Sequence, residues 1–176
     1  ELMFENIKLR WFVLPSLLTA LFLVAIPPVI SWAGALEDAQ EQVRQNPNNA
    51  EAHFDLGNTY VRSGQYQEAI ASYKEAIRIE PDHANEHNNL GYAYQSLGQH
   101  QEAIVSYKEA IRLKPGHARA HWGLAIVYES LGRNDEAIAS YKEALRIKPN
   151  LTVVRNLLNK LEQKIAQAKP APPVRQ

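Results

Sequence analysis

Apolar and small residues follow one another along most of the chain at the three- to four-residue spacing of amphipathic helices, and this pattern repeats every 34 residues. Residues 69–81, 103–115 and 137–149 all begin with Ala-Ile-x-Ser-Tyr-Lys-Glu-Ala and end on proline, with no insertion between copies. A chain that repeats one unit this faithfully stacks its copies. The pattern therefore predicts an array of helical units, which favours a binding or assembly surface over a unique catalytic centre.

Each unit predicts two helices joined by a short turn. In the first unit the helices cover residues 50–63 and 66–80, separated by Gly64 and followed by Pro81. Glycine tolerates the positive φ that ends a helix, and proline stops a helix because it lacks an N–H group. The same turn and stop recur in the later units at Gly98, Gly132, Pro115 and Pro149.

Small residues recur where helices must touch closely, and large residues recur beside them. The small set consists of Gly57, Gly91, Ala125, Ala69, Ala103, Ala137, Ala76, Ala110 and Ala144. The large set consists of Leu56, Leu90, Leu124, Tyr60, Tyr94, Tyr128, Tyr73, Tyr107 and Tyr141. Close packing needs both sets, so they form the predicted core. The i,i+3 pairs that mark the solvent face of each second helix are Glu75–Arg78, Glu109–Arg112 and Glu143–Arg146.

The order of these residues is similar to a known repeat. The first unit carries, in sequence, His53, Leu56, Gly57, Tyr60, Ala69, Tyr73, Ala76 and Pro81. This order and its 34-residue period resemble the tetratricopeptide repeat, with histidine at the family's tryptophan position and tyrosine at its phenylalanine position. The third unit departs further, with Ala125 in place of glycine. The resemblance covers residues 50–151 and implies an all-α fold, a right-handed α-α solenoid of helix-turn-helix repeats.

The resemblance divides the chain into three full units, at residues 50–83, 84–117 and 118–151. A solenoid must also cover its exposed ends. Residues 36–49 predict a lone N-terminal half-repeat helix, and residues 152–168 predict a C-terminal capping helix with one apolar and one polar face. The apolar stripes are Leu36, Ala39 and Val43 at the front, and Val154, Leu157, Leu158, Leu161 and Ile165 at the back. The Pro-rich residues 169–176 predict an extended, disordered tail.

The N-terminal segment has a different character. Residues 11–30 contain no charge, and about 20 apolar residues is the length that crosses a bilayer core. Two basic residues stand just before it, which predicts that the repeats lie on the non-cytoplasmic side, in a periplasm, lumen or extracellular space. Ala33 and Ala35 form the small-x-small pattern of a cleavage site. Residues 1–35 are therefore either a signal peptide cleaved after Ala35 or a single transmembrane anchor.

By the resemblance, the first helix of each unit lines a concave surface. Phe54, Tyr92 and Trp122 form an aromatic track along it, flanked by amides. Aromatic rings supply contact area and amides satisfy backbone groups, which suits an extended or helical peptide, although these rings could instead only shield neighbouring helices. The predicted peptide-binding residues are Phe54, Asn58, Arg62, Asn85, Asn88, Asn89, Tyr92, Arg119, Trp122 and Ile126.

Some relatives grip the C-terminal carboxylate of a peptide with two asparagines and several cations. Asn58, Asn89 and Arg119 match three of those five positions. The other two are Phe54 and Gly123, which cannot hold a carboxylate by charge. This departure argues against recognition of a free peptide C-terminus.

Other motifs do not predict an enzyme. Residues 83–87 fit the H-x-x-E-H order of some zinc proteases, but histidine recurs at 53, 87 and 121 as a repeat position, and packing at helix starts explains it better. The chain has no cysteine and no glycine-rich phosphate loop, so neither a catalytic site, a metal nor a cofactor is predicted. Asn150 begins a glycosylation sequon, which matters only in a secretory compartment.

The formal net charge of zero gives no reason to expect a nucleic-acid partner, but it hides an asymmetry. Residues 36–102 hold eleven acidic and four basic residues, and residues 103–176 hold six acidic and thirteen basic residues. An acidic front and a basic back suggest an alternative function, head-to-tail self-assembly into an oligomer or filament. The main prediction is a scaffold that holds a peptide or partner protein, with a layout similar to small tetratricopeptide proteins of photosystem assembly.

Overall fold

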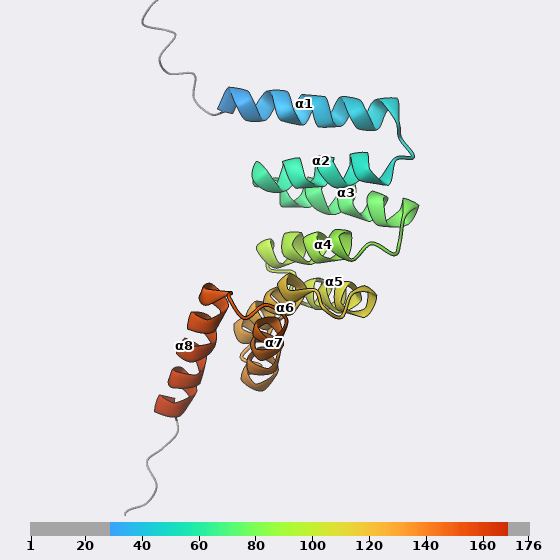
Figure 1. Cartoon of the computed structure of the whole chain (residues 1–176). Coiled ribbons are helices and arrows are strands. Elements are labelled where there is room, and N and C mark those ends of the chain that lie inside the picture. Colours follow the sequence, from blue (N-terminus) through green and yellow to red (C-terminus); the bar gives the residue numbers. More distant parts are fainter. Residues whose placement is uncertain (1–28, 169–176) are drawn as a thin grey trace, which may run out of the picture.

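The computed structural model describes residues 29–168, and within that range the chain consists of eight helices and no strand. The helices are α1 (Val29–Gln45), α2 (Ala50–Arg62), α3 (Tyr66–Ile79), α4 (Ala84–Ser96), α5 (His100–Leu113), α6 (Ala118–Ser130), α7 (Asn134–Ile147) and α8 (Thr152–Ala168). Figure 1 shows them stacked in chain order, with α1 and α8 at opposite ends. The predicted all-α solenoid is confirmed.

The turns inside the units form as the glycines predict. Gly64, Gly98 and Gly132 have φ values of 76°, 71° and 71°. No neighbouring atom stands where a Cβ would be added at these three positions, so the requirement for glycine there is one of backbone conformation alone.

The small and large residue sets meet as expected. A Cβ built on Gly57 would lie 2.5 Å from Cε1 of Tyr73, and one built on Gly91 would lie 2.9 Å from the Tyr107 ring. Tyr73, Tyr107 and Tyr141 are all at most 2% exposed. Each ring therefore fills the space that the small residues of the paired helix leave open.

A hydrogen bond made by the histidines repeats with the units. Nε2 of His53 lies 2.9 Å from the carbonyl oxygen of Pro47, so the ring donates to the turn that follows the preceding helix. The same bond joins His87 to Pro81 and His121 to Pro115. Arg155, 34 residues after His121, donates to the carbonyl of Pro149. These histidines connect one unit to the next.

Each of the two end helices buries one apolar stripe. Ala39 of α1 and Val154, Leu158 and Leu161 of α8 are buried, while the predicted polar face of α8 is exposed. Helix α1 begins at Val29, seven residues before the expected start at residue 36. No proline interrupts the chain between residues 29 and 45, so nothing in the backbone stops the helix from starting earlier.

The predicted membrane or signal segment lies mostly outside the described residues, as does the predicted tail at 169–176. Among residues 29–168, no helix combines the length and the apolar character that a membrane span requires.

Candidate functional site

The first helix of each unit lies on one side of the solenoid, where α2 contacts α4 and α4 contacts α6. A cavity of about 250 Å³ opens there between α4 and α6. It is lined by Asn88, Asn89, Tyr92, Gln95, Tyr107, Arg119, Trp122, Gly123 and Ile126. We call this surface the inner groove and this opening the central cavity.

Six of the ten predicted binding residues line the central cavity, namely Asn88, Asn89, Tyr92, Arg119, Trp122 and Ile126. The other four lie elsewhere. Phe54, Asn58 and Arg62 belong to α2, where the Phe54 ring packs on Tyr73 at 5.8 Å between centroids. Asn85 lies at the start of α4, outside the cavity.

A chain of amide hydrogen bonds orients the wall of the central cavity. Asn58 Oδ1 accepts from Nδ2 of Asn89 at 2.9 Å and from the Tyr73 hydroxyl at 2.9 Å. Asn89 Oδ1 in turn accepts from Nδ2 of Asn88 at 3.0 Å. Asn58 therefore holds Asn89 in one orientation from the neighbouring unit, and the amides at the cavity are positioned before any ligand arrives.

The buried tyrosines reach the inner groove with their hydroxyl groups. Tyr107 donates to Oε1 of Gln95 and Tyr141 donates to Oε2 of Glu129, both at 2.8 Å. Gln95 and Glu129 hold the same place in successive units, and the first unit has Val61 there, so Tyr73 bonds to Asn58 instead. Burial raises the pKa of all three tyrosine hydroxyls, which therefore stay protonated hydrogen-bond donors.

Gly123 lets the Tyr107 ring reach the central cavity. A Cβ built there would lie 2.3 Å from Cζ of Tyr107 and 2.6 Å from its hydroxyl oxygen. The equivalent residue of the second unit is Asn89, whose side chain fills that place. Because Gly123 has no side chain, the Tyr107 hydroxyl end becomes the floor of the cavity. From the sequence, Gly123 was identified only as a lost carboxylate ligand and Tyr107 only as a core residue.

Two aromatic residues form the rim. Tyr92 is 45% exposed, with its ring edge-on to that of Tyr66 at 6.3 Å between centroids. Trp122 is half-buried, and its Nε1 is buried without a hydrogen-bond partner among the described residues. Both rings thus offer apolar area to a ligand.

The inner groove continues from α6 to α8 as a second, basic opening of about 340 Å³. It is lined by Glu129, Lys160, Leu161, Gln163, Lys164 and Gln167. Helix α8 continues the repeat register as if it were the first helix of a fourth unit. Lys160 and Lys164 are then equivalent to Asn58 and Arg62, 102 residues earlier. Helix α8 was predicted only as a cap, but extending the 34-residue period through it would have identified both lysines.

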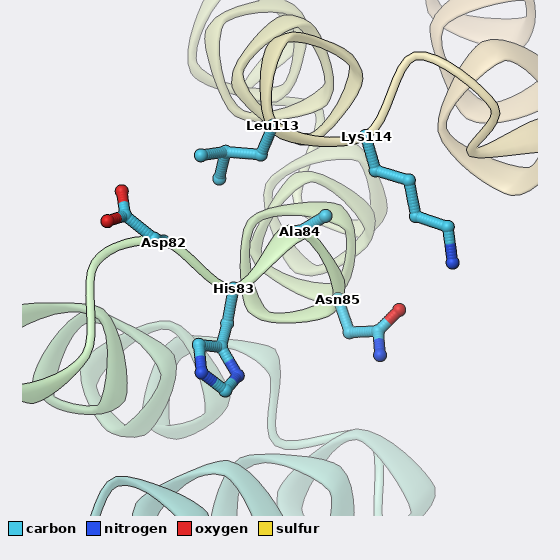
Figure 2. A pocket seen from close by; sticks show the side chains of 6 residues that line it. All are labelled: Asp82, His83, Ala84, Asn85, Leu113 and Lys114. Atoms are coloured by element: carbon cyan, nitrogen blue, oxygen red, sulfur yellow. The ribbon is translucent and has the colours of Figure 1, made fainter.

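Asn85 belongs to a crevice between the start of α4 and the end of α5. Its Oδ1 accepts from Nε2 of His117 at 3.1 Å, a bond from the first turn of α4 to the residue that caps α6. In Figure 2 the His83 ring points away from Leu113, and Lys114 extends along the side opposite to Asp82. Side chains that diverge in this way do not converge on a ligand, so the crevice is a junction between units.

The protease-like motif does not converge on a metal. His83 contacts two carboxylates, Glu80 at 3.0 Å and Glu86 at 3.3 Å, whereas His87 bonds to the Pro81 carbonyl. Within residues 29–168, no group of three or more histidine, cysteine, aspartate or glutamate side chains is arranged to hold a metal ion.

The chain resembles several solved structures, although no curated protein matches it. The crystal structure of MamA is 29% identical, with a TM-score of 0.73 over 77% of this chain and 79% of that one. The first TPR of Spaghetti (RPAP3), bound to the HSP90 peptide SRMEEVD, is 26% identical, with a TM-score of 0.65 over 67% of this chain and 94% of that one. The NMR structure of the first TPR domain of human RPAP3 is 26% identical, with a TM-score of 0.66 over 69% of this chain and 96% of that one.

Two family models match the repeats directly. The model described as TPR repeat matches residues 57–98, and the model described as tetratricopeptide repeat matches residues 88–151. Together they match residues 57–151, which include most of the first predicted unit and all of the second and third, in the part of the chain that folds as a solenoid of helix pairs. Through residues 57–151, the chain belongs to the tetratricopeptide repeat family.

Proposed function

We propose that this protein is a non-enzymatic scaffold whose inner groove holds a segment of a partner protein. One observation carries the proposal: Gly123 lets the Tyr107 ring reach a cavity that is lined by aromatic and aliphatic side chains, beside amides that the fold has already oriented. A related repeat domain is known with a bound peptide, the HSP90 peptide SRMEEVD. Interaction with proteins or peptides is also what the repeat family generally does.

The lining of the central cavity determines what it can bind. Tyr107, Trp122 and Ile126 would enclose one apolar side chain of the partner. The amides of Asn88, Asn89 and Gln95 carry both donors and acceptors, so they can satisfy the N–H and C=O groups of an extended backbone. The groove is therefore suited to a peptide with one apolar anchor residue.

The charges of the inner groove favour acidic residues beside that anchor. Arg119 lines the central cavity, and Lys160 and Lys164 line the opening next to it. The one acidic residue in these two linings, Glu129, already accepts the Tyr141 hydroxyl. Because two of the five carboxylate-gripping positions are Phe54 and Gly123, we propose an internal acidic segment as ligand, not a free C-terminus.

Synthetic peptides test this proposal directly. The probes are peptides amidated at the C-terminus, each with one apolar anchor followed or preceded by glutamates, and the same peptides with lysines instead. Fluorescence anisotropy with the full chain in detergent should show binding of the acidic set only. Trp122→Ala, and Lys160→Glu with Lys164→Glu, should each weaken it about tenfold or more. The matched control reverses two exposed lysines outside both linings, Lys108 and Lys148. Equal binding by every variant would contradict the proposal that the inner groove binds the peptide.

We further infer that the repeats are exported or tethered to a membrane through residues 1–35. The support is the uncharged run at residues 11–30 and the basic residues before it. The N-terminal sequence and mass of the protein purified from its own cells test this inference. A mature chain beginning at Leu36 means a cleaved signal peptide, and an intact segment with membrane-protected residues means an anchor. An intact chain that fractionates without membranes would contradict both.

A further inference from the structure

A further opening lies away from the inner groove and is formed by α3, α4 and α5. Its volume is about 760 Å³, about three times that of the central cavity. It is lined by Lys74, Ile77, His87, Leu90, Tyr94, Gln101, Glu102, Ile104, Val105, Ser106 and Glu109. None of these residues belongs to the linings of the inner groove, so this outer groove is a separate surface.

The repeat provides an internal comparison. The crevice one unit later, between α5 and α7, has a volume of about 370 Å³ and is lined by residues in the same register. One substitution separates the two linings most clearly: Val105 is replaced there by Ala139, and the first unit has Ala71. Val105 is 68% exposed. The second unit thus carries an aliphatic side chain in solvent where its neighbours carry only a methyl group.

The exposed valine stands directly beside an apolar hollow. Ile77 from α3, Leu90 from α4 and Ile104 from α5 contribute its apolar wall. Covering an exposed valine removes apolar area from water, which favours association. When one face carries both a projection and a hollow, two copies related by a two-fold axis can each insert the projection into the hollow of the other.

The charges on the walls of the outer groove are also self-complementary. Lys74 stands on α3 and Glu102 on α5, and neither forms an ion pair within residues 29–168. Lys74 instead lies 5.6 Å from the Tyr94 ring centroid. Glu109 on the same wall is already bound by Arg112. One free cation and one free anion on opposite walls can meet their counterparts when a second copy is turned by a two-fold rotation.

We propose that the outer groove pairs with the same surface of a second copy to form a two-fold symmetric dimer. Val105 of each copy enters the outer groove of the other, and Lys74 of each copy faces Glu102 of the second copy. The two inner grooves stay open, so the dimer would present two binding surfaces. This proposal does not depend on the function of the inner groove, and either can fail without the other.

The absence of cysteine from the chain makes a sharp test possible. Val105→Cys in the full chain places one thiol beside the proposed axis. Ala71→Cys and Ala139→Cys place it at equivalent exposed positions one unit away on either side. All three variants retain the same N-terminal segment, so any association through that segment affects them equally. After mild oxidation, or with a short bismaleimide, a non-reducing gel should show a covalent dimer for Val105→Cys and little for the two controls. Equal yields for all three, or no dimer from Val105→Cys, would overturn the proposal.

Charge reversal provides a second, independent readout in the Val105→Cys background. Lys74→Glu or Glu102→Lys alone replaces two opposite-charge contacts with like-charge contacts, and should lower the cross-linking yield about tenfold. The two changes together restore opposite charges and should restore the yield. Lys108→Glu, one unit later, is the matched control and should leave it unchanged. If both single reversals leave the yield intact, the pairing is wrong. If Val105→Cys cross-links only to a different protein and not to a second copy, the outer groove binds that protein and the dimer proposal is overturned.

Discussion

Tyr107 lies so close to the backbone of Gly123 that a single added carbon atom at residue 123 would stand 2.3 Å from Cζ of the ring. The two residues come from different units, Tyr107 from the second helix of one and Gly123 from the first helix of the next. Their contact leaves the tyrosine hydroxyl, bonded to Gln95, at the floor of the central cavity. The shape of the proposed binding surface therefore depends on a missing side chain.

Gly123→Ala should change the shape of the central cavity. The added methyl group must displace the Tyr107 ring, which we expect to cost about 1–3 kcal/mol of unfolding free energy and to weaken peptide binding more strongly. Gly116→Ala is the matched control, because no atom lies within 4 Å of a Cβ there. Urea denaturation and anisotropy together measure both effects. Unchanged binding by a folded Gly123→Ala protein would show that the ligand does not use this cavity.

His117 should make stability depend on pH. Its Nδ1 accepts from the Ala120 N–H at 3.2 Å, and burial lowers its pKa. Below the unfolded pKa of about 6.5 the unfolded chain binds the proton more readily, so stability falls as the pH drops from there towards the lower folded pKa. His117→Asn keeps a capping acceptor, as Asn49 does for Ala52, without a titrating group. The difference between the two urea midpoints should shrink from pH 7 to pH 5. Parallel midpoint curves would contradict this role.

Glu86 should reduce stability. It is 6% exposed, its Oε2 has no hydrogen-bond partner in the described part of the chain, and the equivalent residues Ala52 and Ala120 are alanines. Glu86→Ala removes a buried carboxylate of which only Oε1 has a contact, with His83, and we expect the free energy of unfolding to rise by about 1 kcal/mol. Glu80→Ala, at the exposed carboxylate on the other side of His83, should change it by no more than about 0.5 kcal/mol. A destabilised Glu86→Ala protein would mean that the carboxylate has a stabilising partner.

The head-to-tail alternative predicts assembly that salt abolishes. Both end helices carry exposed charges, with Glu37, Asp38 and Glu41 on α1 and Lys160 and Lys164 on α8. Contacts between such faces would be electrostatic, and screening shortens from about 30 Å to about 3 Å between 0.01 and 1 M ionic strength. We expect light scattering from the full chain to show no species beyond a dimer across that range. Large particles at low salt that dissolve at high salt would favour the alternative.

Much of the fold could be predicted because its determinants are local and repeated. Gly64 and Pro81 act through their own backbone, and the Tyr73 and Gly57 pair meets within one unit. A 34-residue period then transfers each local inference to the next two units. The stripes of α1 and α8 could be predicted for the same reason, since a helix buries a stripe that its own sequence defines.

The candidate site could be predicted only in part. Tyr92, Trp122 and four other residues were identified because a register position identifies the face of a helix. Asn85 was expected in the groove, but it bonds to His117, the residue that caps α6. Gly123 seemed to weaken the site, because a sequence position reports the side chain present and not the space that its absence opens.

The sequence by itself predicted an all-α stack of three helix pairs and its capping helix, through its period, glycines, prolines and apolar stripes. This was possible because each of those features acts within one helix or one turn. The central cavity, the bond from Asn58 to Asn89 and the outer groove beside Val105 could be recognised only in three dimensions. Each of them is formed between units, where residues about 15 to 35 positions apart meet, and the shape of such a contact depends on how the units stack.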